Sequence, residues 1–109
     1  MGDITCSVVI PVYNEDKNIL EIHRQLTDVF SPLGINYEII FVDDGSTDNS
    51  LDLIKHIASF DKKVFYISLS RNFGHESAST AGLEAARGDC AILMDADLQD
   101  PPSLIPDML

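Results

Sequence analysis

The sequence predicts an α/β fold, a Rossmann-like parallel sheet with helices on both of its faces. Short apolar segments of strand type alternate along the chain with segments in which apolar residues recur every three or four positions. Strands that alternate with helices form parallel sheets joined by right-handed crossovers. The strand segments are almost continuously apolar, which is typical of a sheet covered on both faces. No internal repeat, linker or low-complexity stretch interrupts the pattern.

Strands and helices are expected in strict alternation. The apolar runs place the strands at residues 7–13, 37–42, 64–69 and 90–94. Periodicity and capping residues place the helices over 15–30, after an N-cap at Ser46 or Thr47, over 75–87, and after a cap at Asp100. Small residues on one side of the third helix predict that it lies close to the sheet.

Length and composition limit the possible functions. A chain of 109 residues has room for one domain. Its net charge of −11, with 18 acidic residues against 7 Lys and Arg, argues against nucleic acid as a partner. No apolar run reaches the roughly 18 residues of a membrane span, and the N-terminus lacks a signal-peptide pattern, so a soluble, cytoplasmic chain is expected. Cys6 and Cys90 are expected to be buried free thiols, with a disulfide as the alternative.

The C-terminal residues predict that the protein continues. Leu104, Ile105, Met108 and Leu109 have the spacing of the apolar face of a helix that has just begun, and no cap follows. We therefore expect residues 1–109 to be the truncated front part of a longer protein. On its own, such a part exposes a sheet edge and an apolar helix face, which favours a homo-oligomer.

Polar residues follow each of the four predicted strands. They lie at 11–15, 43–48, 70–74 and 95–100. Ligands of open α/β sheets bind at the carboxyl ends of the strands. The four clusters are therefore expected to converge on one edge of the sheet and to form a single site.

The last cluster predicts a metal site. In extended backbone, residues i and i+2 point the same way, which puts Asp95 and Asp97 on one face. Two like charges about 4 Å apart repel by roughly 4 kcal/mol at an effective dielectric constant of 20. A hard divalent cation, Mg²⁺ or Mn²⁺, offsets this repulsion, and Gln99 adds a carbonyl oxygen on the same side. The alternative is a solvated acidic turn.

The first two clusters predict contacts to a nucleotide. Asp43 and Asp44 can accept hydrogen bonds from a base or from ribose hydroxyls, although Asp-Gly-Ser-Thr is also a good strand-to-helix loop. Tyr13 offers a ring for base stacking, or is a half-buried aromatic at a strand end. Glu15 is a ribose ligand or a favourable acid in the first turn of a helix.

The third cluster contributes a basic residue. Arg71 can contact a diphosphate or a base, with a surface salt bridge as the alternative. His75 is expected to be a surface histidine at a helix start, with a proton shuttle as the alternative. No G-x-G-x-x-G follows the first strand and no P-loop is present, which argues against the usual dinucleotide-binding fold.

The four motifs together resemble those of one enzyme family. The order PVYNE (11–15), DDGSTD (43–48), SRNFG (70–74) and DADLQDPP (95–102) resembles the family 2 glycosyltransferases with the GT-A fold. It is most similar to the branch with bacterial polyprenyl-phosphate sugar transferases and dolichyl-phosphate mannose synthases. The resemblance implies an inverting, metal-dependent transferase that uses a UDP- or GDP-sugar donor and a polyprenyl-phosphate acceptor. It also implies that residues 1–109 are the nucleotide-binding half of the domain, and that the longer protein acts at the cytoplasmic face of the membrane.

The resemblance also implies roles for individual residues. Those that match family positions near the base and ribose of the donor are Pro11, Tyr13, Glu15 and Asp43. Asp95 and Asp97 match the catalytic motif that binds metal and diphosphate, and Gln99 matches a metal-associated position. Arg71 lies in a loop that borders the donor site of the family.

Other classes of protein share single motifs with this chain. A haloacid-dehalogenase-type phosphatase also carries D-x-D at a strand end, but a small residue and Thr or Val normally follow, whereas Leu98 and Gln99 follow here. A receiver-like signalling domain shares residues 41–44, but it needs a late lysine, and no lysine follows Lys63. A non-catalytic nucleotide-binding module is the remaining alternative.

Overall fold

The fold is the α/β arrangement that the sequence predicts. The computed structural model describes residues 3–97 together with Pro102 and Ile105. The described elements, in chain order, are β1 (Cys6–Val12), α1 (Ile19–Phe30), the 3-10 turn η1 (Ser31–Leu33), β2 (Tyr37–Asp43), α2 (Ser50–Phe60), β3 (Val64–Ser68), α3 (His75–Ala85) and β4 (Cys90–Leu93). The helix expected after Asp100 lies outside the described residues.

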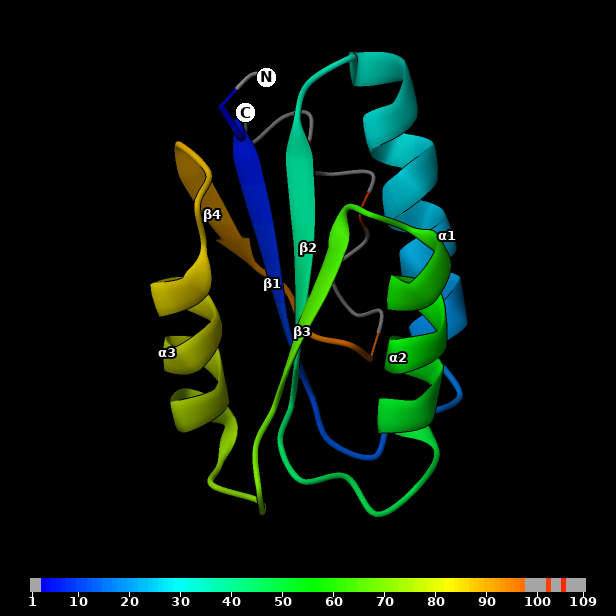
Figure 1. Cartoon of the computed structure of the whole chain (residues 1–109), viewed down its shortest axis with the longest axis vertical. Coiled ribbons are helices and arrows are strands. Elements are labelled where there is room, and N and C mark those ends of the chain that lie inside the picture. Colours follow the sequence, from blue (N-terminus) through cyan, green and yellow to red (C-terminus); the bar gives the residue numbers. More distant parts are fainter. Residues whose placement is uncertain (1–2, 98–101, 103–104, 106–109) are drawn as a thin grey trace.

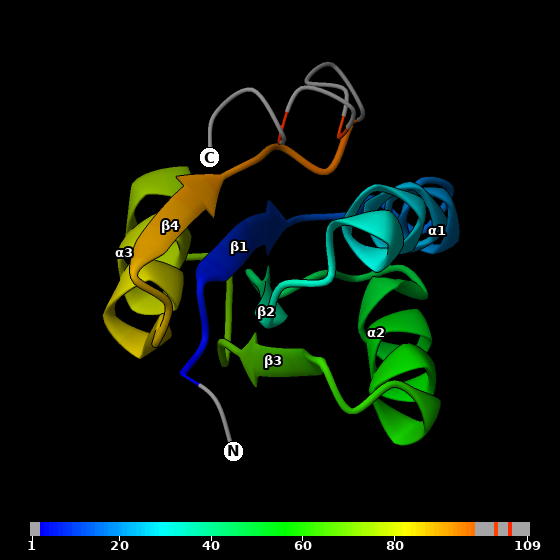
Figure 2. The same ribbon diagram turned by 90° about the horizontal axis from the view of Figure 1, so that it is seen from above.

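The four strands form one parallel sheet in the order β3-β2-β1-β4 (Figure 1). The chain builds outward from β1 through β2 to β3, and then crosses back to place β4 on the other side of β1. The helices α1 and α2 cover one face, and α3 covers the other (Figure 2). The direction of winding therefore reverses between β1 and β4, and such a reversal opens a crevice at the carboxyl ends of the two strands.

The main core lies between the sheet and the helices α1 and α2. The apolar side of α1 recurs at helical spacing and is fully buried at Ile19, Ile22 and Leu26. It packs against alternate residues of the two central strands, such as Ile10 and Phe41. Truncating a side chain as buried as Leu26 to Ala costs about 2–5 kcal/mol, so this layer supplies much of the stability.

The opposite face is covered by a thinner layer. A Cβ atom on Gly82 would lie 2.3 Å from Cγ1 of Val9, so α3 approaches the sheet closely, as its small residues predict. Its cover is narrow, and large apolar side chains on the two edge strands stay 42% exposed at Phe65 and 44% exposed at Leu93. The prediction that all four strands are buried on both faces is therefore wrong for β3 and β4, because the described helices cover these two edge strands incompletely.

Two helices begin later than predicted. α1 starts at Ile19 rather than near Glu15, and α2 starts at Ser50 after Asn49 rather than after Ser46 or Thr47. The residues before each helix bond to the other loop instead. Asn14 adopts a positive φ of 53°, and its Oδ1 accepts hydrogen bonds from the Thr47 and Asp48 amides at 2.8 and 3.3 Å. The Asp48 amide is one that a side-chain cap at Ser46 would bond to, so its bond to Asn14 takes the place of the expected cap. Together these bonds tie the loops after β1 and β2 to each other.

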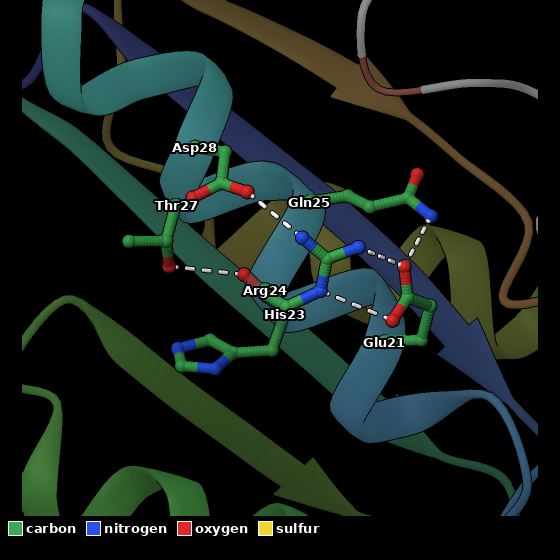
Figure 3. A network of polar contacts seen from close by, with 6 residues as sticks. All are labelled: Glu21, His23, Arg24, Gln25, Thr27 and Asp28. Carbon is green, nitrogen blue, oxygen red and sulfur yellow. Dashed lines mark hydrogen bonds and ion pairs between the residues drawn. The ribbon is translucent and has the colours of Figure 1, made fainter.

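The outer face of α1 is an ordinary charged helix surface (Figure 3). Arg24 binds Glu21, and it also donates to Asp28 at 3.0 Å. Gln25 donates to Glu21 at 2.7 Å. The hydrogen bond from Arg24 lowers the pKa of Glu21. Because these groups are exposed, solvent and salt screen the pairs and each contributes little to stability.

The amino end of the sheet contains a buried carboxylate with a full set of partners. Glu38 on β2 is 1% exposed. Its Oε2 accepts from the Ser7 hydroxyl at 2.6 Å and the Arg87 amide at 2.7 Å. Its Oε1 accepts from Nε and Nη2 of Arg87 at 3.1 and 2.9 Å. Burial acts to raise the pKa of Glu38, but the bonds from Ser7 and Arg87 outweigh it and leave the pKa below its usual value.

The two cysteines differ in exposure. Cys6 is buried, as predicted, but Cys90 is exposed, so the expectation of two buried thiols is wrong for Cys90. The reason is that β4 lies at the edge of the described sheet, where Cys90 pairs in register with Cys6. Both are free thiols. In the described part of the chain, no helix is long and apolar enough to cross a membrane.

Candidate functional site

The loops after the strands meet at the crevice between β1 and β4, where the topology predicts a ligand. Two hollows lie side by side there. One, of about 330 Å³, is lined by Pro11, Tyr13, Glu15, His75, Asp95, Ala96 and Asp97. The other, of about 270 Å³, is lined by Pro11, Val12, Tyr13, Asp44, Asn72, Gly74 and His75. Pro11, Tyr13 and His75 border both, so the two hollows form one divided cleft.

A larger hollow of about 470 Å³ lies at the other end of the sheet, around Glu38 and Arg87. Size alone does not make it the site. Its basic residues Arg87, Lys62 and Lys63 are balanced by the acids Glu38, Asp3 and Asp89 in the same lining. Glu38 is already saturated by its own hydrogen bonds, so the carboxyl end carries the better candidate.

The loop after β1 presents an aromatic ring at the cleft. Tyr13 is 46% exposed, which leaves its ring available for stacking. The backbone behind it is fixed, because the Asn14 and Glu15 amides each donate at 2.9 Å, to the hydroxyls of Ser46 and Ser50 respectively. Oε2 of Glu15 accepts from the Asn18 side chain at 2.8 Å, so this carboxylate helps to order the turn that leads into α1.

Asp43 ends β2 as a buried carboxylate that is incompletely bonded. It is 2% exposed, and its Oδ2 accepts from the Ser46 amide at 3.3 Å. Its Oδ1 is buried without a hydrogen-bond partner from the described residues. An unsatisfied buried acceptor costs about 1–3 kcal/mol, and more if it is charged. This oxygen is therefore a candidate acceptor for a donor from outside the described residues.

Both carboxylate oxygens of Asp44, by contrast, accept hydrogen bonds from within the protein. Its Oδ1 accepts from the Phe73 amide at 2.8 Å. Its Oδ2 accepts from the Gly74 amide at 3.0 Å and from the Asn72 side chain at 3.3 Å. Asp44 thus fixes the loop after β3 and the start of α3. In this structure its carboxylate shapes the border of the cleft through that loop.

The loops after β2 and β3 touch through their backbones. Gly45 has a φ of +72°, and a Cβ atom there would lie 2.4 Å from backbone atoms of both Arg71 and Asn72. A side chain at this position would push the two loops apart. The guanidinium of Arg71 lies 4.5 Å from the ring centre of Phe73. Among the predicted site residues that the structure describes, Arg71 and Asp43 line neither hollow.

The loop after β4 places two carboxylates on the cleft. Asp95 and Asp97 both line the first hollow, as predicted, but Ala96 and Asp97 lie in a turn rather than in extended backbone. The strand before them ends at Leu93 and is largely exposed, so the expectation of a buried strand is wrong. Ala96, 3% exposed, anchors the turn in the core. Gln99 lies outside the described residues.

The chemistry of these donors fits a hard cation that is shared with a ligand. Asp95 and Asp97 supply carboxylate oxygens at one hollow. Within residues 3–97, no three His, Cys, Asp or Glu side chains come close enough to enclose a metal ion. Mg²⁺ typically uses one or two carboxylates and takes its other oxygens from water and substrate phosphates. The pair therefore suits an open site completed by a phosphorylated ligand.

His75 occupies a more central place than the sequence predicts. It lies at the surface at the start of α3, as expected, and it also borders both hollows. Its Nε2 lies 3.1 Å from Oδ1 of Asp95. A signal for this position exists in the sequence, since His75 directly follows the third polar cluster and the carboxyl ends of parallel strands converge.

Comparison with known proteins gives one consistent result. The family model described as "Glycosyl transferase family 2" matches residues 7–109. The "Uncharacterized glycosyltransferase YkcC" of Bacillus subtilis is 45% identical over 97% of this chain and 33% of its own length. The "Undecaprenyl-phosphate 4-deoxy-4-formamido-L-arabinose transferase" of Pseudomonas fluorescens is 48% identical over 92% of this chain and 30% of its own length. The chain thus spans about a third of the length of these curated relatives.

Solved structures share the fold. The crystal structure of S. aureus TarS 1-349 in complex with UDP-GlcNAc superposes with a TM-score of 0.74 at 26% identity, over 86% of this chain and 27% of that one. The mannosyltransferase PcManGT from Pyrobaculum calidifontis, in complex with GDP-Man and Mn²⁺, superposes with a TM-score of 0.66 at 20% identity, over 89% of this chain and 28% of that one. The described part of the chain therefore matches the N-terminal part of GT-A structures.

Proposed function

We propose that this chain forms the donor-binding part of a glycosyltransferase, since it belongs to glycosyl transferase family 2. The observation that carries the proposal is the buried Oδ1 of Asp43, an acceptor with no donor among the described residues. Asp43 pairs with Val12, which lines the second hollow, and Tyr13, Asp95 and Asp97 line the first. Such an arrangement suits a ligand with hydrogen-bond donors at one end and a diphosphate at the other. A nucleotide sugar has this form.

The nucleoside end of the donor binds at the loops after β1 and β2. Asp43 accepts a hydrogen bond from the base or from a ribose hydroxyl, which satisfies its Oδ1. The exposed ring of Tyr13 stacks on the base, while Pro11 and Glu15 flank the ribose. The relative TarS, which is 26% identical and was solved with UDP-GlcNAc, supports a UDP- or GDP-sugar as the donor class.

The diphosphate end binds at the turn after β4. Asp95, Asp97 and Gln99 would hold Mg²⁺ or Mn²⁺ there, and a bound cation would supply Lewis-acid stabilisation of the negative charge on the departing diphosphate. The two aspartates line the same hollow and are the proposed catalytic residues, because they would hold this cation. Arg71 is one of the 7 Lys and Arg residues. It directly precedes Asn72, which lines the second hollow, and from there it can reach a phosphate oxygen.

The acceptor in the longer enzyme is a polyprenyl phosphate. Relatives 46–48% identical to this chain are undecaprenyl-phosphate sugar transferases by name. A phosphomonoester has a second pKa of about 6, so at pH 7 it is largely a dianion and attacks without a strong general base. Its oxygen bonds to the anomeric carbon as the bond to the nucleoside diphosphate breaks, and this single displacement inverts the centre. A lipid acceptor places the reaction at a membrane surface, and the proposal puts it on the cytoplasmic face.

Titration of the chain with UDP- and GDP-sugars tests the proposal. Calorimetry should show binding of one nucleotide class that strengthens in Mn²⁺ and weakens in EDTA. Asp97→Asn should remove the metal-dependent part while leaving the melting temperature unchanged. Equal affinity in EDTA and Mn²⁺ would contradict the metal site, and hydrolysis of a generic phosphoester would favour a phosphatase instead.

The acceptor is tested with a protein of the relatives' length. A radiolabelled donor should pass its sugar to polyprenyl phosphate, with inversion at the anomeric carbon visible by NMR. The 109-residue chain alone should bind nucleotide weakly and transfer no sugar, because positioning both reactants can supply roughly 7–11 kcal/mol of the rate enhancement. Transfer to a free sugar hydroxyl, with none to polyprenyl phosphate, would overturn this part.

A further inference from the structure

We propose that His75 is a positioning residue for Asp95, which it holds by one carboxylate oxygen so that the other is directed at the cation. The inference rests on the proposed function, since it concerns the same metal site. Nε2 of His75 lies 3.1 Å from Oδ1 of Asp95, and Nδ1 lies 3.5 Å from the Ser79 hydroxyl. Ser79, His75 and Asp95 therefore form a chain of polar contacts from α3 to the turn after β4.

The direction of the hydrogen bonds in this chain follows from the donors available. An ionised carboxylate is an acceptor, so Nε2 of His75 carries the proton in the contact with Asp95. In the neutral ring Nδ1 is then an acceptor, and the Ser79 hydroxyl donates to it. Ser79 is 7% exposed and lies one helical turn after His75, so it approaches the ring from the sheet side of α3. In this neutral form the two contacts orient the ring, the shorter one to Asp95 at 3.1 Å and the longer one to Ser79 at 3.5 Å.

A rigid framework supports the position of His75. Asp44 binds the Phe73 and Gly74 amides immediately before it, which fixes where α3 begins. The same helix lies against the sheet at Gly82, where a Cβ atom would be 2.3 Å from Val9. The backbone of His75 is therefore held from both sides. Asp95, in contrast, lies beyond the end of β4, just before the turn at Ala96 and Asp97, and is half-exposed.

The two oxygens of Asp95 therefore have different roles: Oδ1 accepts from His75, and Oδ2 remains for the cation. A carboxylate that ligates a metal is commonly held by a hydrogen bond outside the coordination shell, and loss of such a partner typically lowers metal affinity about 10- to 100-fold. His75 also lines the hollow shared with Tyr13 and Asp97, so the bond joins the two sides of the cleft. Without it, Asp95 must be ordered at the moment of binding, and the entropic cost weakens the site.

The test is Mn²⁺ affinity in saturating UDP or GDP, whichever binds, measured by the EPR signal of free Mn²⁺. His75→Ala and His75→Asn should weaken Mn²⁺ binding about 10-fold or more, because Asn is too short to reach Asp95. His75→Gln should bind Mn²⁺ nearly as the parent does, because its amide nitrogen reaches as far as Nε2. A side chain that matters merely for folding would change melting temperatures instead, and these should stay constant because His75 is 60% exposed.

A matched control exists on the other face of the sheet. His23 Nε2 lies 2.8 Å from Oδ2 of Asp61, a second histidine–aspartate pair away from the cleft. His23→Gln should leave Mn²⁺ affinity unchanged. The inference is overturned if His75→Ala and His75→Asn bind Mn²⁺ as the parent does while Asp97→Asn does not. If the parent and Asp97→Asn bind Mn²⁺ equally poorly, the proposed metal site itself fails, and the inference fails with it.

Discussion

Strand β2 carries a buried carboxylate near each end, and the two differ in how completely they are bonded. Glu38, at the amino end, accepts four hydrogen bonds from Ser7 and Arg87. Asp43, at the carboxyl end, accepts one from Ser46 and keeps a buried oxygen without a partner from the described residues. Both side chains are almost fully buried, at 1% and 2% exposure. The difference is therefore one of hydrogen bonding rather than of burial.

This difference separates a structural carboxylate from one that serves a ligand. Burying a charge is costly unless hydrogen bonds and an opposite charge compensate. At Glu38 the protein supplies the compensation itself, so nothing remains for a ligand to add. At Asp43 the compensation is incomplete, and a ligand with a donor would complete it. The fold thus tolerates an incompletely bonded carboxylate at Asp43, where binding is expected, and avoids one at Glu38.

The largest expected effect is on folding, at Glu38. Glu38→Gln removes the charge that holds Arg87 and places an NH₂ group among donors. Hydrogen bonds to charged groups contribute about 1.5–3 kcal/mol. Because Arg87 is 59% exposed and therefore screened by solvent, we expect a loss of about 2 kcal/mol in the free energy of unfolding, measured with urea, and no change in nucleotide affinity.

The control for this change is the exposed pair on α1. Glu21→Gln breaks a similar contact between a glutamate and an arginine, drawn in Figure 3. It should alter stability by less than about 0.5 kcal/mol, as surface substitutions usually do. Equal losses at Glu38 and Glu21 would show that burial and full hydrogen bonding at Glu38 do not matter.

The next effect is on binding, at Asp43. Asp43→Asn removes the negative charge of this buried carboxylate but keeps an oxygen for the Ser46 amide. The free energy of unfolding should stay the same or rise slightly, while nucleotide affinity should fall about 10-fold, or ~1.4 kcal/mol, by calorimetry.

The neighbouring residue gives the opposite expectation. Asp44→Asn replaces an oxygen that accepts from the Phe73 or Gly74 amide with a donor. It should destabilise the protein by about 1–3 kcal/mol. If Asp43→Asn destabilised the chain and left nucleotide affinity intact, Asp43 would belong with Glu38 as a structural carboxylate.

A smaller effect concerns acid stability. The pKa of Glu38 lies below its usual value in the folded chain. Its contribution is therefore fully present above the unfolded pKa of about 4.3, and it is lost as the pH falls through the folded value. Thermal melts between pH 7 and pH 3 should show a loss of stability that is shallower in Glu38→Gln than in the parent. Parallel curves would mean that Glu38 titrates alike in both states.

The sequence predicts the architecture better than it predicts the details of the site. The strands and the alternation were predictable because apolar runs of strand length recur between polar loops, and the cleft follows from the convergence of strand ends. The first residues of the helices were not predictable, because the Thr47 amide bonds to Asn14, a residue 33 positions away. Local capping rules at Ser46 and Thr47 cannot register a partner in another loop.

The roles of neighbouring acids were also beyond the sequence. Asp43 and Asp44 are chemically equivalent in the motif. Within the described part of the chain, however, Asp43 has one oxygen without a partner, whereas both oxygens of Asp44 accept from the loop after β3. The same holds for His75, whose contact with Asp95 spans 20 residues. Each distinction depends on the side to which a backbone amide or ring points, and the pattern of residue types does not contain that information.

The smallest effect distinguishes the two thiols at the amino end of the sheet. Burial, together with the neighbouring Cys90, raises the pKa of Cys6 to about 12. The thiolate is the nucleophile in alkylation, so Cys6 should be inert at pH 8 while the exposed Cys90 reacts. Mass spectrometry after iodoacetamide treatment should show one label on the native chain and two in denaturant. The contrary result would be that Cys6 is labelled in the native chain, and at the same rate in the parent and in Glu38→Gln. It would mean that β4 separates from β1 locally. The amino end of the sheet would then open more easily than the hydrogen bonds of Glu38 indicate. The difference between Glu38 and Asp43 would in that case concern only their own hydrogen bonds, and not the stability of the two ends of the sheet.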